Sequence, residues 1–178
     1  MLLAFDVDLA SDARSARCAC GGALHRADYP RKPRGGPADL DPAYATRFSF
    51  CCARDDCRRR TTPPSVRFLG RRVYLAAVVV LVAAMRHGVT PPRVAQLTAW
   101  FGVTARTLAR WRLWWTETFV RSPVWIALRG RLMPPIDEAR LPTSWWERID
   151  ASTEAARVLR LLVFLLPFSA RTAVGVAV

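Results

Sequence analysis

Five cysteines carry the clearest chemistry of this 178-residue chain, and all of them lie in its first third. The first cluster contains Cys18 and Cys20, and the second, after thirty intervening residues, contains Cys51, Cys52 and Cys57. Two close groups of thiols separated by a loop are typical of a tetrahedral zinc site, because each group closes a tight turn and the loop brings the groups together. The spacing therefore predicts one bound Zn²⁺ ion.

Four of the five thiols are enough for this site, and the uncertain choice is between Cys51 and Cys52. Phe48 and Phe50 alternate with polar residues in a short strand pattern, which places them on the same face as Cys52. His25 is an alternative ligand. The alternatives to zinc are free structural thiols or a disulfide framework, and the odd number of cysteines disfavours the disulfides. The predicted ligands are Cys18, Cys20, Cys52 and Cys57, with Cys51 as the alternative.

Positive charge is concentrated in the middle of the chain. The formal net charge is +13, and residues 47–112 contribute +11 of it, from thirteen arginines against Asp55 and Asp56. A compositional bias towards arginine would spread this charge evenly, whereas a nucleic-acid-binding face would concentrate it. The charge distribution predicts a polyanionic partner, and we expect double-stranded DNA.

Residues 94–115 (VAQLTAWFGVTARTLARWRLWW) match the pattern of a helix-turn-helix. With Gly102 at the turn, Thr98 takes the position where the helices approach, and Thr104 becomes the N-cap of the second helix. The predicted core positions of this helix pair are Leu97, Phe101, Val103, Leu108 and Trp111; Trp114 and Trp115 are interpreted as core residues too.

The expected DNA contacts lie on the second helix of this pair and on a basic linker before it. On the helix, small residues permit close approach to the major groove, and arginines can bond guanine edges or phosphates. In the linker, arginines are expected to hold phosphates. The predicted contacts are Thr104, Ala105, Arg106, Thr107, Arg110 and Arg112 on the helix, and Arg58, Arg59, Arg60, Arg67, Arg71 and Arg72 in the linker.

The elements that must position these residues predict a mainly α fold, in which a small N-terminal zinc-ribbon-like β unit precedes a helix-turn-helix bundle. The apolar run from Val73 to Met85 is predicted to be a buried scaffold helix, because thirteen residues are too few to cross a membrane. We expect a soluble, cytoplasmic protein. The predicted regions are a disordered leader (1–15), the zinc-ribbon-like domain (16–62), the helix-turn-helix domain (63–122), a helical extension (123–168) and a disordered tail (169–178).

Three segments together resemble the zinc-ribbon plus helix-turn-helix proteins of bacterial insertion elements: CACGGALHRADYPRKPRG, FSFCCARDDCRRRTTPPSVRFLGRRVYL and LTAWFGVTARTLARWRLWW. The resemblance covers roughly residues 18–150. It implies that the chain binds DNA as the terminus-binding part of a transposase or as an accessory protein, with the four preferred cysteines at the metal positions.

The expected function is therefore DNA binding without catalysis. A transposase would need a nuclease domain with three carboxylates, whereas the acidic residues after Trp115 are expected on solvated helix faces. A transposase or another protein is a further candidate partner, while no small-molecule substrate and no membrane are expected. The alternative is a zinc-ribbon and helical module that binds proteins, or a transcriptional regulator without a role in transposition.

Overall fold

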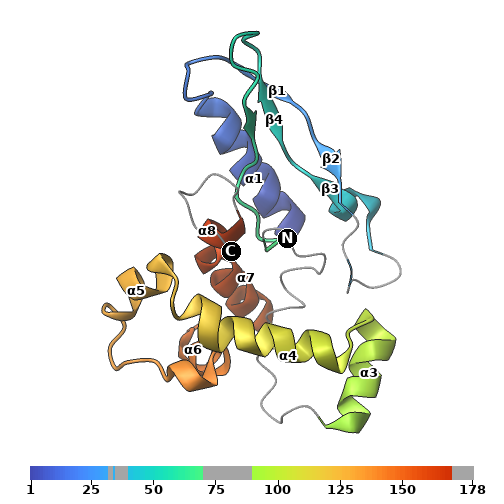
Figure 1. Ribbon diagram of the computed structural model, residues 1–178, viewed down its shortest axis with the longest axis vertical. Helices are drawn as coiled ribbons and strands as arrows, with labels where there is room; N and C mark the ends of the chain where they lie inside the picture. Colours follow the sequence, from blue (N-terminus) through green and yellow to red (C-terminus); the bar gives the residue numbers. More distant parts are fainter. Residues whose placement is uncertain (32–33, 35–39, 70–89, 170–178) are drawn as a thin grey trace. The chain divides into compact units, whose positions relative to one another are not determined.

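The computed structural model describes residues 1–31, 34, 40–69 and 90–169, which form two compact units. Unit 1 contains the described residues of 1–34 and 40–69 together with 162–169, and unit 2 contains residues 90–161. The described part is mainly α-helical with a small amount of antiparallel sheet, as the sequence predicted (Figure 1). None of its helices has both the length and the apolar character needed to cross a membrane.

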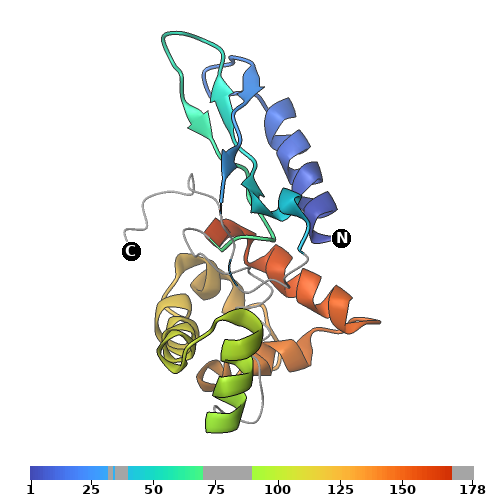
Figure 2. The same ribbon diagram turned by 90° about the vertical axis from the view of Figure 1, so that its right-hand side faces the viewer.

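Unit 1 places one long helix alongside short antiparallel strands (Figures 1 and 2). In its three-stranded sheet the order is β1-β4-β5, and β2 pairs with β3 separately. The β1–β4 register sets Leu24 opposite Cys52 and His25 opposite Cys51. The elements are α1 (Leu2–Ser15), β1 (Leu24–Arg26), β2 (Tyr29–Pro30), the 3₁₀ turn η1 (Pro42–Ala45), β3 (Thr46–Arg47), β4 (Phe50–Cys52), β5 (Arg60–Thr61) and α8 (Leu166–Ser169).

The prediction of a disordered leader is wrong, because residues 2–15 form α1. This helix packs on the sheet: Ala10 is buried in one cluster with apolar strand residues and two cysteines, and Leu3 and Ala13 pack against that cluster. The helix thus supplies apolar surface that strands of two or three residues lack. The buried members of the cluster are Ala10, Cys18, Leu24, Phe48, Phe50 and Cys52.

A fully buried ion pair between Asp6 of α1 and Arg67 joins two distant parts of unit 1. Arg67 Nε donates to Asp6 Oδ2 at 2.7 Å, and both side chains are 0% exposed. The remaining donors of Arg67 reach the carbonyls of Ala43 and Thr46, while the Asp6 carboxylate also accepts bonds from Ser65 and Val66. Such complete pairing is what allows two charges to be buried.

This ion pair corrects the predicted domain boundary after residue 62. Residues 65–69 are all buried in unit 1, so they are part of its core and not an exposed linker. The predicted helical extension is also divided, since unit 1 includes the residues from Leu162 onwards. Ser169, predicted to begin a disordered tail, ends α8, and the rest of that tail lies outside the described residues, as does the predicted scaffold helix from Val73 to Met85.

Unit 2 consists of helices joined by short turns. Its elements are α3 (Pro91–Phe101), α4 (Ala105–Leu113), the π-helical segment η2 (Trp114–Phe119), α5 (Pro123–Arg129), the 3₁₀ turn η3 (Glu138–Arg140), α6 (Thr143–Arg148) and α7 (Glu154–Phe164), whose last turn belongs to unit 1.

Aromatic side chains form a large part of the core of unit 2. The Phe119 ring contacts Trp115, Trp125 and Trp145, with centroid separations between 4.9 and 5.8 Å. Trp125 Nε1 donates to Glu138 Oε1 at 2.7 Å, so this buried indole keeps a partner. Trp111 and Trp115 are buried, which confirms their prediction as core residues, and Trp114 is half-buried.

Candidate functional site

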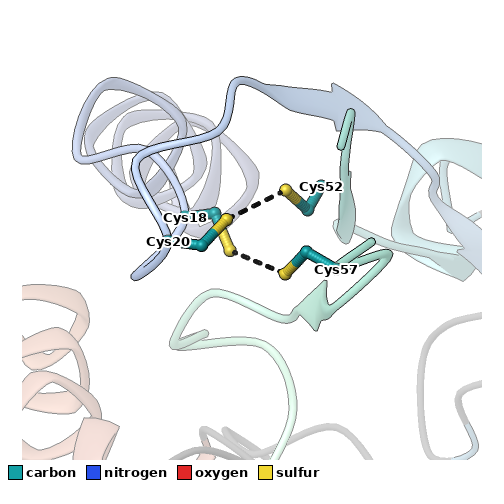
Figure 3. Close-up of side chains that lie close together, drawn as sticks. All are labelled: Cys18, Cys20, Cys52 and Cys57. Carbon is teal, nitrogen blue, oxygen red and sulfur yellow. Dashed lines mark hydrogen bonds between the residues drawn. The ribbon is translucent and has the colours of Figure 1, made fainter. Parts of the chain in front are cut away.

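Four cysteine side chains converge at one end of unit 1 (Figure 3). Cys18 and Cys20 lie in the turn after α1, Cys52 ends β4, and Cys57 lies in the turn before β5. Their sulfur atoms all lie within 4.8 Å of one another; Cys20 and Cys52 are 3.5 Å apart, and Cys18 and Cys57 are 3.8 Å apart. They are the four predicted ligands, they form no disulfide, and they are close enough to hold a metal ion.

The S···S distances suit a tetrahedral centre. A metal–sulfur bond of about 2.3 Å requires sulfurs about 3.8 Å apart at the edges of a regular tetrahedron. A disulfide, in contrast, would require about 2.0 Å. The separations of 3.5 and 3.8 Å lie close to the tetrahedral edge.

Two tight turns hold these ligands. In the first, Gly21 N donates to the carbonyl of Cys18 at 2.7 Å, and Gly21 has a positive φ of +82°. Gly22 is needed for a different reason: a Cβ there would lie 2.6 Å from Cys52 Sγ. In the second turn, Cys57 N donates to the carbonyl of Arg54 at 3.1 Å.

Strand alternation decides between the two adjacent cysteines. Cys52 is buried, whereas Cys51 lies on the opposite face of β4, where its thiol contacts the carbonyl of Arg58. His25, the alternative ligand, is exposed opposite Cys51 and does not belong to the cluster. Cys52, and not Cys51, therefore belongs to the cluster that could hold a metal ion.

The thiols differ in acidity. A hydrogen bond from the Gly22 backbone, aided by the Cys52 thiol, lowers the pKa of Cys20 to about 7. The Arg54 backbone favours the Cys52 thiolate too, but burial and the neighbouring thiols outweigh it and raise the pKa of Cys52 to about 12. A thiol that ionises near neutral pH gives an incoming cation its first thiolate.

A charged pair supports the second turn beside the sulfurs. The Arg54 guanidinium donates to both carboxylate oxygens of Asp56, at 2.8 and 3.1 Å. The Asp56 carboxylate raises the pKa of Arg54, and the neighbouring cysteines act in the same direction. The turn thus holds a cation next to a centre that becomes anionic when its thiols ionise.

The second candidate site is the pair α3 and α4. Gly102 ends α3 with φ +61°, and Thr104 begins α4 by accepting the backbone N–H of Thr107, so both predicted roles are confirmed. Thr98 Oγ1 donates to the carbonyl of Val103 at 2.7 Å across the turn. Four of the five predicted core residues, Leu97, Val103, Leu108 and Trp111, are buried, and Phe101 is half-buried.

The solvent-facing side of α4 is basic. Ala105, Arg106, Arg110 and Arg112 are exposed, as expected, together with Ala109. Thr107 was predicted to contact DNA, but it is only 6% exposed and so is not accessible to a ligand. Its hydroxyl accepts a hydrogen bond from Arg110 Nη2 at 3.2 Å. Thr107 shares a helix face with Leu108 and Trp111, which turns it towards the core.

The predicted linker arginines fall into three groups. Arg59 and Arg60 are exposed, and Arg58 is exposed but paired with Asp55. The prediction that Arg67 contacts phosphate is wrong, because its guanidinium is buried against Asp6. Arg71 and Arg72 lie outside the described residues.

Three carboxylates in unit 2 serve the local structure. Glu138 accepts the Trp125 indole, Glu147 pairs with Arg140, and Asp137 caps η3. Across the described residues, the four cysteines form the only cluster of three or more metal-binding side chains. Sequence reasoning missed the Asp6–Arg67 pair, because neither residue has a sequence neighbour that signals the other.

The described residues therefore offer two chemistries: four thiols that can bind a metal cation, and an arginine-bearing helix that can bind an anion. No protein-family model matches the sequence, and no curated protein or solved structure is significantly similar to it.

Proposed function

We propose that this chain is a zinc-stabilised protein that binds duplex DNA, with α3 and α4 acting as a helix-turn-helix and α4 as its recognition helix. The observation that carries the proposal is the exposed face of α4, where Arg106 and Arg112 form no ion pair with any described residue. No acidic residue occurs between Asp56 and Glu117 to neutralise this face. Unneutralised guanidinium groups on an exposed helix are suited to phosphates and base edges.

The arginines later in unit 2 provide the contrast. Arg129, Arg140 and Arg157 pair with glutamates, and Arg148 donates to the carbonyls of Met133 and Pro134. Arginine is abundant throughout the chain, but many of the later arginines have a partner within the fold. The stretch of sequence without acidic residues that contains α4 is therefore a local feature, and it supports a role in binding an external polyanion.

The metal proposed is Zn²⁺. A closed set of four thiolates at tetrahedral spacing is typical of structural zinc, and it leaves no open position for a substrate. The ligands would be Cys18, Cys20, Cys52 and Cys57, and their loops would form a zinc-ribbon-like centre. When bound, zinc would stabilise unit 1, whose strands have only two or three residues.

The biological setting proposed is a mobile element, with the chain acting as part of a transposase or as its accessory protein. This rests on the resemblance of the cysteine, linker and helix segments to the proteins of insertion elements. We propose no catalytic activity, and the structural roles of Asp137, Glu138 and Glu147 support this.

The test is duplex binding by the zinc-loaded full chain, measured against salt concentration. We expect log K to fall linearly with log salt, with a slope of about −0.9 for each phosphate contacted. Arg59→Ala should weaken all sequences alike, whereas Arg106→Ala should also lose sequence preference. Arg140→Ala is the matched control, since it removes an arginine that is paired with Glu147 and should change neither the affinity for DNA nor the sequence preference.

Two results would contradict the proposal. Duplex binding that ignores salt would exclude a phosphate-binding surface. Equal losses from Arg106→Ala, Arg59→Ala and Arg140→Ala would show that only total charge matters and would remove α4 from the role of recognition helix.

A further inference from the structure

A chain of three hydrogen-bonding side chains runs along the first turns of α4. Arg110 Nη2 donates to Thr107 Oγ1 at 3.2 Å, and Thr107 Oγ1 lies 3.2 Å from Thr104 Oγ1. Because Thr107 accepts from Arg110, its own hydroxyl hydrogen is free to point at Thr104. Thr104 is fixed in turn as the N-cap, through the backbone N–H of Thr107.

This chain distinguishes the two arginines on the exposed face. Arg110 is held by a hydroxyl that is almost completely buried, whereas Arg106, one turn earlier, has no such support among the described residues. The bond to Thr107 uses one of the five N–H donors of the guanidinium, so four remain for a ligand. An arginine held in place before binding loses less conformational entropy when it makes a bidentate contact.

The chemistry of this face selects one base. Arginine forms bidentate hydrogen bonds with O6 and N7 of guanine, whereas adenine is read by asparagine or glutamine and cytosine by carboxylates. The exposed face of α4 has only arginine and alanine at positions 105, 106, 109 and 110, and the whole chain contains no asparagine. Arg106 and Arg110 are four residues apart, about 6 Å along the helix axis, which is within two base-pair steps of about 3.4 Å.

We propose that α4 reads two guanines no more than two base-pair steps apart, and that Thr107 is a positioning residue that holds Arg110 for one of them. This inference rests on the proposed function and specifies its target. Thr107 acts through Arg110 and does not itself touch DNA.

The experiment selects bound duplexes from a random pool with the zinc-loaded full chain, then measures affinities for the selected site and for its single-base variants. We expect guanine at both positions, each preferred about tenfold over other bases. Arg110→Ala should abolish one preference, whereas Arg110→Lys should weaken that preference and keep the salt slope, because lysine retains the charge but lacks the planar fork of arginine. Arg106→Ala should abolish the other preference.

Thr107→Val tests the positioning role, because it keeps the shape of the side chain and removes the hydroxyl. We expect the preference read by Arg110 to fall about fivefold, while the preference read by Arg106 and the salt slope stay unchanged. Thr107→Ser should restore the lost preference. Thr116→Val is the matched control, since its hydroxyl donates only to the backbone carbonyl of Arg112.

The outcomes separate the inference from the proposed function. DNA binding with a motif that lacks the two guanines, or equal losses at both positions from Thr107→Val, would overturn the inference and leave DNA binding intact. A full preference in Thr107→Val would overturn the positioning role. Failure of the zinc-loaded chain to bind any duplex would overturn both proposals.

Discussion

Gly22 gives the sharpest test of the proposed metal centre, because it lies against Cys52 without being one of the proposed ligands. A Cβ at this position would lie 2.6 Å from Cys52 Sγ and 3.0 Å from Arg54 Cγ. Non-bonded carbon atoms pack at about 3.5–4.0 Å, and sulfur is larger, so Gly22→Ala must displace the Cys52 sulfur by about 1 Å. A metal site tolerates errors in ligand distance of only about 0.2 Å.

The expected effect is large. Structural zinc sites have apparent binding free energies of about 10–16 kcal/mol, so loss of one ligand in four removes about 3 kcal/mol and weakens binding about 100-fold. Competition with a chromophoric chelator measures the affinity. Substitution with Co²⁺ reports the geometry, because its visible absorption depends on tetrahedral coordination by thiolates.

Gly21→Ala is the matched control in the same turn. Gly21 has φ +82° but nothing lies within 4 Å of its Cβ position, so alanine strains the backbone without touching a sulfur. The left-handed conformation costs about 1–2 kcal/mol, which should weaken binding about tenfold and leave the Co²⁺ spectrum unchanged. Wild-type affinity and spectrum in Gly22→Ala would refute the proposed role of Cys52, and so would a greater loss in Gly21→Ala.

Zinc affinity should rise with pH from 6 to 8, because the pKa of Cys20 is lowered only to about 7 and protons compete with the metal below that pH. Chelator competition measures this affinity, and an affinity that does not change with pH would contradict thiolate ligation. Asp6→Asn should lower the free energy of unfolding by about 3–5 kcal/mol, because it leaves Arg67 buried without its counterion. Asp56→Asn breaks an exposed pair and should lower the free energy of unfolding by about 1 kcal/mol or less. Denaturant titration measures both variants, and equal losses would argue against a buried Asp6–Arg67 pair.

The cluster of four cysteines could be predicted because its evidence is local. Each cysteine group belongs to one turn, and the alternation of Phe48 and Phe50 with polar residues identified Cys52 over Cys51. The roles of Gly102 and Thr104 were equally local, since a positive φ and an N-cap depend on a few neighbouring residues.

The role of Arg67 was predicted wrongly because it depends on a contact between positions that lie far apart in the sequence. Arg67 is one basic residue in a basic, proline-containing segment, and only its pairing with Asp6, sixty-one residues away, buries it. The same ion pair holds Asp6 of α1, which also packs on the sheet through Ala10. Thr107 could have been placed correctly, because it lies four residues before the buried Trp111 and so shares its helix face.

The two units should respond differently to removal of the metal. In unit 1, Cys18 and Cys52 belong to the buried cluster and Cys57 packs against it, so three of the four proposed metal ligands are part of the core or in contact with it. The core of unit 2 is rich in aromatic residues and contains no cysteine, and all seven tryptophans of the chain lie in this unit. Tryptophan fluorescence therefore reports on unit 2 alone.

We expect a chelator to expose unit 1 to proteolysis while the tryptophan emission stays at its native wavelength. Because α4 lies in unit 2, the chelated protein should keep its base preference and lose affinity, through the arginines at positions 58–60 in unit 1. A red shift in tryptophan emission on chelation would show that unit 2 depends on the metal. Loss of base preference at unchanged affinity would place recognition in unit 1 instead of α4.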